Sequence, residues 1–222
     1  LELAAAGAKV LHLRCVEYAR RYNLPIHVRS SFSPNEGTWV VENHPEGGTM
    51  EQAIISGVAH DKSEAKVTIV GVPDRTGIAA RIFQAIADND INVDMIVQNV
   101  SAAATGLTDI SFTVSKTEGQ KATDVLKRIQ GEVGFVSLIY DDTIGKLSLV
   151  GAGMRSHPGV TATFFASMAD AGVNIEMIST SEIRISVIVR EADVERAAKA
   201  AHSAFGLDAD QIEAVVYGGT GR

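Results

Sequence analysis

The 222-residue sequence is poor in the residues that mark several classes of protein. Cys15 is its one cysteine, which excludes an internal disulfide framework and a metal site built on thiolates. We expect Cys15 to be a buried small side chain, as free cysteines usually are. Runs of Lys or Arg are missing and the formal net charge is -7, which argues against nucleic acid or an anionic membrane as partner.

Long hydrophobic runs are missing as well. No apolar stretch approaches the roughly 20 residues that cross a bilayer, and the N-terminus lacks the charged-then-apolar layout of a signal peptide. The sequence therefore predicts a cytoplasmic protein. It opens at Leu1 inside an apolar run, so we expect a piece of a longer polypeptide. The hydrophobic fraction of 45% suffices for a packed core.

An internal repeat organises most of the chain. Residues 67–96 (VTIVGVPDRTGIAARIFQAIADNDINVDMI) align with residues 147–178 (LSLVGAGMRSHPGVTATFFASMADAGVNIEMI), with two extra residues in the second copy. The alignment places Gly77 on Gly159 and Asn92 on Asn174. Chance rarely holds a register over such a length, so the sequence predicts two homologous domains.

Each copy has the pattern of a βαββαβ unit. A β-rich run ends at a glycine-containing loop, apolar residues then recur one helical turn apart, and alternation of period two predicts antiparallel strands. The fold class is therefore α+β, with two ferredoxin-like domains in tandem. We expect strands near 67–70, 93–97, 110–114 and 135–140 in the first copy and near 147–150, 183–189 and 214–217 in the second, with inward helix faces at Ile78, Ile82, Ile86, Ala122, Val125, Leu126 and Ile129, and at Val160, Phe164, Met168, Val194, Ala197, Ala198 and Ala201.

The residues ahead of the repeats form a third part. The sequence predicts a helix over 8–22, a strand over 26–28 and a linker over 42–49, where Pro and paired Gly discourage regular structure. Residues 54–59 read as one further strand that either sheet can take. The predicted division is an N-terminal piece with its linker over 1–45, a first domain over 50–143 with its core at 65–141, and a second domain over 144–222 that can recruit strand 53–60.

The loop over 73–78 carries the chemistry of the first copy. It leads from a strand into a helix, so its unpaired amides can receive an anion such as the carboxylate of an amino acid. Asp74 can receive the ammonium, the Asn92 amide suits either end of a zwitterion, and Gln98 can read a polar side chain. The second copy offers a loop over 154–160 and polar residues over 174–176 and 180–182.

Simpler interpretations compete with binding. Asp74 or Thr76 can simply cap the helix, although the repetition of Gly and Asn in both copies favours a binding pair. The glycines at 151 and 153 resemble a dinucleotide loop only weakly, because the next glycine is Gly159. The six histidines lack ligand spacing, so no metal site is expected.

These motifs resemble the regulatory region of aspartate kinases, in particular the lysine- and threonine-sensitive type of actinobacteria with tandem ACT domains. The resemblance rests on SEAKVTIVGVPDRTG, INVDMIVQNVS, GAGMRSHPGVTATFF and NIEMISTSEIRISVIV, and residues 7–32 look like the end of the family's kinase domain. It implies an allosteric region that binds threonine, lysine or both, forms a homodimer through its ACT domains and serves a kinase catalytic domain or alpha subunit. ATP and Mg would belong to the kinase portion, so no cofactor is expected here.

The resemblance also bears on how such a chain arises and on which of its residues bind an effector. Some family members make a separate regulatory subunit from an internal start, and Met50 lies where such a start is expected. The alternatives are a fragment of a single-chain aspartate kinase known for its catalysis and an ACT sensor for another amino acid. The effector contacts carry over onto Asp74, Gly77, Ile78, Ala79, Ile91, Asn92, Val93 and Gln98, and onto His157, Pro158, Gly159, Val160, Asn174, Ile175, Thr180, Ser181 and Glu182.

Overall fold

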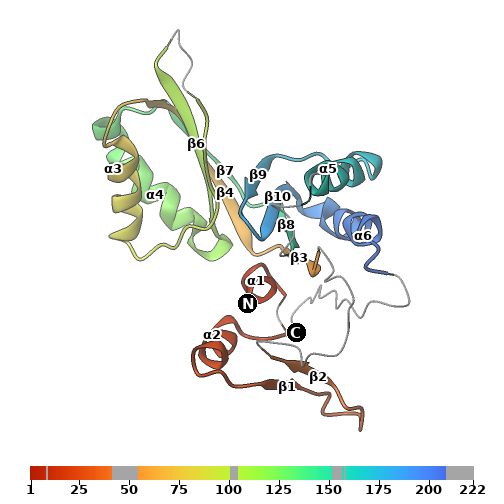
Figure 1. Cartoon of the computed structure of the whole chain (residues 1–222). Coiled ribbons are helices and arrows are strands. Elements are labelled where there is room, and N and C mark those ends of the chain that lie inside the picture. Colours follow the sequence, from red (N-terminus) through yellow and green to blue (C-terminus); the bar gives the residue numbers. More distant parts are fainter. Residues whose placement is uncertain (9, 42–54, 101–104, 152–156, 158, 209–222) are drawn as a thin grey trace.

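The computed structural model describes residues 1–8, 10–41, 55–100, 105–151, 157 and 159–208 (Figure 1). An N-terminal part holds the helices α1 (Glu2–Ala5) and α2 (Leu13–Arg21) and the antiparallel pair β1 (Ile26–Val28) and β2 (Thr38–Val40). Two helix-on-sheet domains follow. Within the described ranges, no helix combines the length and the apolar content that a membrane crossing needs.

Two expectations for the N-terminal part are wrong. The helix expected over 8–22 begins only at Leu13, after the turn at Gly7, whose φ is +116° and whose missing Cβ lets it approach the carbonyl oxygen of His60. Cys15 is exposed, not buried. The inward face of α2 carries Val16, and a residue one position earlier is rotated by about 100° around a helix with 3.6 residues per turn.

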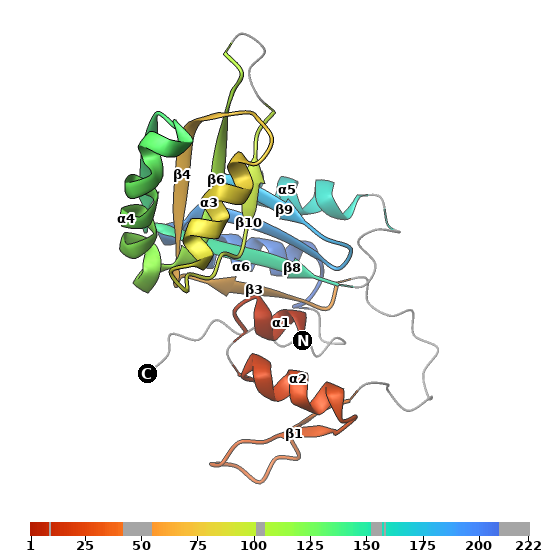
Figure 2. The same cartoon turned by 90° about the vertical axis from the view of Figure 1, so that its left-hand side faces the viewer.

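The first domain has the expected architecture. Its strands are β4 (Glu64–Pro73), β5 (Ile96–Gln98), β6 (Leu107–Ser115) and β7 (Ser137–Asp141), in the order β5-β6-β4-β7, and all neighbours are antiparallel. The helices α3 (Ile78–Ala87) and α4 (Lys116–Val133) cover one face of this sheet (Figure 2). The core is built from strand residues such as Ile69 and Phe112 and from the expected helix faces.

The strand expected over 93–97 is shorter than its alternation indicated. Regular pairing with β6 begins at Ile96. Ahead of it, the backbone N–H of Asp94 donates to the carbonyl of Thr113, and the N–H of Met95 donates to the Thr113 hydroxyl. Val93 packs on the helix-covered core, whereas Met95 is buried on the opposite side of the sheet. The pattern therefore identified the less exposed positions, but it was wrong in strand length and in placing Val93 and Met95 on one face.

The second domain repeats the plan. Its strands are β3 (Gly57–Asp61), β8 (Ile144–Val150), β9 (Met177–Thr180) and β10 (Arg184–Arg190), in the order β3-β8-β10-β9. The helices are α5 (Val160–Asp170) and α6 (Val194–Ala204), the latter entered through a short 3-10 turn, η1 (Glu191–Asp193). Phe164, Met168 and the alanine face of α6 are buried as predicted. The strand expected over 214–217 lies outside the described residues.

The two sheets exchange strands, which the sequence left open. β3 leads by a tight turn into β4 of the first domain but pairs with β8 of the second. β7 leads by an equivalent turn into β8 but pairs with β4. β3 is therefore the edge strand next to β8 in the second sheet, just as β7 is the edge strand next to β4 in the first sheet. By topology the first domain, residues 64–141, is inserted between β3 and the rest of the second domain.

The same side-chain device makes both turns. The Asp61 carboxylate accepts hydrogen bonds from the backbone N–H and hydroxyl of Ser63, at 2.8 and 2.6 Å. The Asp141 carboxylate accepts the same pair from Thr143, at 2.9 and 2.6 Å. Such local bonds fix a sharp reversal. They send the chain from one sheet directly into the other.

Asp141 makes stability depend on pH in the acid range. Its burial raises the pKa of this carboxyl group, but the two Thr143 hydrogen bonds and Arg190, 2.6 Å away, outweigh burial and lower it from 3.8 to about 2. The contribution to stability is therefore complete above about pH 4 and lost as the pH falls toward 2; we expect roughly 1 to 2 kcal/mol. Urea unfolding from pH 2 to 6 should show Asp141→Asn to be less stable than the parent at pH 6 and nearly equal at pH 2. A constant difference would contradict this assignment.

Candidate functional site

The first helix of each domain begins at a glycine in the left-handed region. Gly77 is the N-cap of α3 with φ 92°, and Gly159 is the N-cap of α5 with φ 112°. Neither helix start has a side-chain cap hydrogen bond, so the interpretation of Asp74 or Thr76 as a cap is wrong. Ile78 and Val160, the first helical residues, donate their N–H groups back to the carbonyls of Arg75 and His157, at 3.3 and 3.5 Å. The amides of the next residues in each first turn remain for an acceptor from outside the loop. We call residues 73–79, and the described residues 151, 157, 159 and 160 leading into α5, the glycine-capped loops.

A backbone hydrogen bond to the residue ahead of β6 anchors the first glycine-capped loop to the sheet. Asp74 donates its backbone N–H to the carbonyl of Gly106 at 2.9 Å, while Gly77 and Ala79 are exposed and Ile78 rests on the core. Apart from its neighbours in the chain and the backbone of α3, no heavy atom of the described residues lies within 4 Å of where a Cβ on Gly77 would be. The loop therefore presents an open backbone surface to solvent.

A bulge in β4 sets the position of this loop, and the sequence analysis missed its anchor. The register of β4 against β6 shifts between Ile69 and Val72, and Gly71 adopts φ +67° there. Gly71 donates its N–H to the Asp109 carboxylate at 2.8 Å, whereas its counterpart Gly151 donates to the backbone of Ile183 at 3.0 Å. The aligned glycines were visible in the sequence, but their unlike partners, Asp109 on β6 and Ile183 just ahead of β10, were not.

The asparagines lie at the other end of each first helix. We call residues 92–95 and 174–177 the asparagine segments. In the first, Ile91 just ahead is buried, Asn92 is exposed and Val93 packs on the core. In the second, Asn174 is exposed and Ile175 packs on the core. α3 alone has 10 residues, or about 15 Å at 1.5 Å per residue, between Gly77 and the asparagine segment.

This separation corrects the assignment of the loop over 73–78 and Asn92, both in the first copy, to the two ends of one bound amino acid. The first helix must cross its sheet before the chain returns, so loop and asparagine segment fall at opposite ends of one domain (Figure 1). A binding site that uses both needs the loop of one domain and the asparagine segment of another. Within one domain the predicted residues therefore form two half-sites.

The remaining predicted residues lie on exposed strand ends. Gln98 ends the edge strand β5, paired with Ile110, and its side chain is exposed. Thr180 ends the edge strand β9, and Ser181 follows with its N–H bonded to the carbonyl of Arg184 at 2.7 Å. Glu182, His157 and Gly159 are exposed, Val160 is buried, and Pro158 lies outside the described residues.

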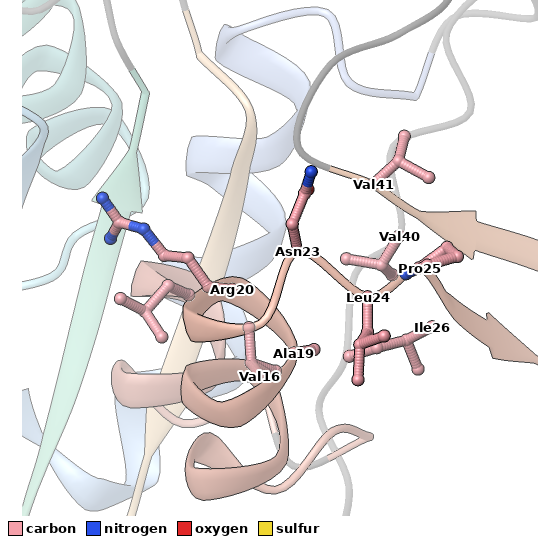
Figure 3. Close-up of a pocket in the computed structure, with 10 residues that line it drawn as sticks. Val16, Ala19, Arg20, Asn23, Leu24, Pro25, Ile26, Val40 and Val41 are labelled. Carbon is pink, nitrogen blue, oxygen red and sulfur yellow. The ribbon is translucent and has the colours of Figure 1, made fainter.

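A hollow of about 680 Å³ lies elsewhere, in the N-terminal part. Figure 3 shows Leu24, Pro25, Ile26 and Val40 gathered on one side of it, while the Arg20 side chain extends away from them. Its lining comes from α2, β1 and β2 and from other residues of the N-terminal part, and includes none of the predicted binding residues. The hollow is therefore a feature of residues 1–41 and not of the repeated domains.

Comparison with known proteins agrees with this architecture. The model of the ACT domain family matches residues 67–129 and 147–205, which are the two repeats. The chain is therefore a tandem ACT-domain protein. The aspartokinases of Mycolicibacterium smegmatis and Mycobacterium tuberculosis are 59% and 60% identical to it over all 222 residues, which are 52% of each relative. The chain thus spans about half the length of these relatives.

Solved structures narrow the assignment. The regulatory subunit of aspartate kinase from Thermus flavus is 43% identical with a TM-score of 0.65, and the match covers 68% of this chain and 99% of that one. A structure of aspartokinase alpha and beta subunits is 45% identical with a TM-score of 0.64 and is covered to 98%. The chain belongs to the aspartate kinase family and corresponds to its regulatory part.

Proposed function

We propose that this chain is an allosteric amino-acid sensor that binds threonine, lysine or both. The observation that carries the proposal is the pair of glycine-capped loops, repeated in both domains, each starting a helix without a side-chain cap. The carboxylate of a free amino acid satisfies such amides, and the helix dipole favours its charge. An exposed asparagine and Gln98 or Thr180 can then bind the ammonium and the side chain.

We further propose that a second copy of the chain completes each site. A loop and an asparagine segment lie at opposite ends of one domain, so they can meet only across an interface. Exposed apolar residues on the outer strands, including Ile96 at 49% and Ile139 at 54%, support pairing of such domains. In this proposal the homodimer expected from the sequence forms the binding site, because one copy supplies the loop and the other supplies the asparagine segment.

Titration calorimetry with threonine and with lysine at millimolar concentrations tests the sensor. A binding heat for at least one of them is expected, together with a rise in the melting temperature. A ligand at 100 times its dissociation constant stabilises the fold by about 2.7 kcal/mol. Absence of both effects for both amino acids would reject the proposal, and stabilisation by some other amino acid would indicate a different ACT sensor.

Single substitutions test the predicted contacts. Asn92→Ala and Gln98→Ala each remove a buried partner of a polar ligand, so affinity should fall by about 1 to 3 kcal/mol, or roughly 5- to 150-fold. Both side chains are exposed without ligand, so the free chain should keep its melting temperature. Gln120→Ala, an exposed glutamine on α4, is the matched control. Unchanged calorimetric affinity would return the two residues to a structural role.

The longer relatives favour a second statement about the whole protein. We propose that residues 1–41 are the end of a kinase domain that phosphorylates aspartate with ATP. Tyr18, Phe32 and Trp39 are exposed at 63%, 98% and 53%, which supports packing of this part against further residues. The isolated chain is predicted to be inactive. An ADP-release assay with aspartate and ATP decides this, and turnover would contradict it. The cytoplasmic location stays a prediction.

A further inference from the structure

The facing sheets of the two domains meet at a small apolar centre. Met95, Ile144, Met177 and Ile188 are buried together there, with Val97 packed against them. In the repeat Met95 is the counterpart of Met177, so both domains bring the same position to this centre. Figure 2 shows the strands of the two sheets crossing, with the helices on their outer sides. The asparagine segments therefore end at the contact between the domains.

Of the ion pairs that cross between the domains, two beside this centre are related by the repeat, and Lys146 also binds Glu64 on β4. Lys66 on β4 binds Glu176, which precedes β9 of the second domain. Lys146 on β8 binds Asp94, which precedes β5 of the first domain, with 2.5 Å between Nζ and Oδ2. The repeat equates Lys66 with Lys146 and Asp94 with Glu176. The structure thus makes one interaction twice, in opposite directions.

The Lys66–Glu176 pair is shielded from water on both sides, and the Lys146–Asp94 pair on the lysine side, since the Asp94 side chain is 40% exposed. The side chain of Lys146 is 3% exposed, and those of Lys66 and Glu176 are 15% and 11% exposed. Burial lowers the pKa of the Lys146 ammonium, but the charges and hydrogen bonds of Glu64 and Asp94 outweigh burial and raise it. Ion pairs in such surroundings are screened little by salt, so movement of one partner is felt by the other.

Each acid belongs to an asparagine segment. Asp94 and Glu176 follow Asn92 and Asn174 by two residues. Their backbone N–H groups donate to Thr113 and Ile188 of their own sheets, at 3.1 and 2.8 Å. Each asparagine segment is thereby tied to its own domain through the backbone and to the other domain through a carboxylate. The Glu176 carboxylate also binds Arg190 of its own domain, with 2.6 Å between Oε1 and Nε.

We propose that the crossed ion pairs couple the two asparagine segments, so that an amino acid bound at one segment changes the affinity at the other. This rests on the proposed function. A ligand that draws Asn92 toward itself moves Asp94 relative to Lys146, and β8 continues from Lys146 into the second glycine-capped loop. The reverse holds for Asn174, Glu176 and Lys66 on β4. Thermodynamic linkage requires the two effects to be equal.

The experiment titrates threonine into the 222-residue chain with and without saturating lysine, and lysine with and without saturating threonine, by calorimetry. The parent should show each ligand changing the dissociation constant of the other by about five-fold or more. Where one amino acid fills both kinds of site, the ratio of its stepwise dissociation constants measures the same coupling. Asp94→Asn and Glu176→Gln should bring the factor below about two-fold.

Matched controls separate coupling from a structural role. Asp124→Asn and Glu132→Gln remove acids whose ion pairs lie within one domain, with Lys127 and Arg81, and should keep the parental factor. Asp94→Glu retains the charge and should keep it as well. The Asp94 side chain is 40% exposed, so Asp94→Asn should fold, which the melting temperature checks.

The outcomes are distinct. Equal coupling in the parent and in both pair variants overturns the inference and leaves the sensor standing. Independent binding in the parent, or one ligand per chain, also overturns it. Binding of neither amino acid to the parent rejects the proposed function itself.

Discussion

A chain that starts at Ser63 is expected to lose the folded second domain. Such a chain lacks β3, whose five residues pair with β8 from Gly57 opposite Val150 to Asp61 opposite Lys146. It also lacks Ile55 and Val58, which are 4% and 2% exposed in the core of the second domain. Burying two such side chains contributes about 1.5 to 3 kcal/mol each. The lost ladder bonds add roughly 1 kcal/mol apiece.

The summed loss approaches the whole stability of a small domain, which is about 5 to 15 kcal/mol. The first domain keeps all four of its strands, because β7 lies within residues 64–141. Hydrogen exchange should therefore show protection on β4 and β6 and little on β8 and β10. A chain that starts at Met50 retains β3 and is the control, with both sheets protected.

Adding the missing strand as a peptide sharpens this test. A synthetic peptide of residues 55–62 carries β3 and both core residues, so it should restore protection to β8 when added to the shortened chain. A peptide in which Val58 is replaced by Asp should not. Equal protection of both sheets without any peptide would mean that the second domain has another closing strand.

Replacing Lys146 by Met is expected to cost about 3 to 5 kcal/mol of unfolding free energy, because it leaves a buried carboxylate without its partner. Lys146 is 3% exposed and Glu64 is 9% exposed. The other Glu64 carboxylate oxygen has no hydrogen-bond partner among the described residues. Lys146 is thus the group that compensates the buried charge of Glu64.

The double variant Lys146→Met with Glu64→Leu should recover most of this loss, since an apolar pair of similar volume often replaces a buried ion pair without cost. The repeat supports the exchange, because Ile144 occupies the position equivalent to Glu64 and is fully buried. Urea unfolding of the parent, both single variants and the double variant gives the coupling energy. Additive effects would show that the two residues do not depend on each other.

The secondary structure was predictable where spacing alone decides it. The faces of α5 and α6 were identified from residues one turn apart, and Phe164, Met168 and Ala201 are buried as that spacing requires. The repeat also placed the glycines at 77 and 159 in loops ahead of helices, but the structure showed that they are the N-caps, in a conformation that other residues rarely adopt. Whether these loops bind an amino acid remains a prediction.

The arrangement of the half-sites was only partly accessible. That Gly77 and Asn92 stand apart follows from the length of α3 and could have been drawn from the sequence. The anchoring of Gly71 by Asp109 could not, because 38 residues separate them and the second repeat uses a backbone carbonyl instead. Cys15 was expected to be buried because free cysteines usually are, but its position on α2 leaves it exposed.

The sequence by itself determined two α+β repeats, their helix faces and the glycine-containing loops ahead of their first helices, because these depend on residues a few positions apart. Only the tertiary structure decided that β3 and β7 exchange between sheets and that Lys66 and Lys146 reach across to Glu176 and Asp94. Either sheet offers an apolar edge to a strand such as β3. The choice depends on the packing of both domains at once, which no local pattern records.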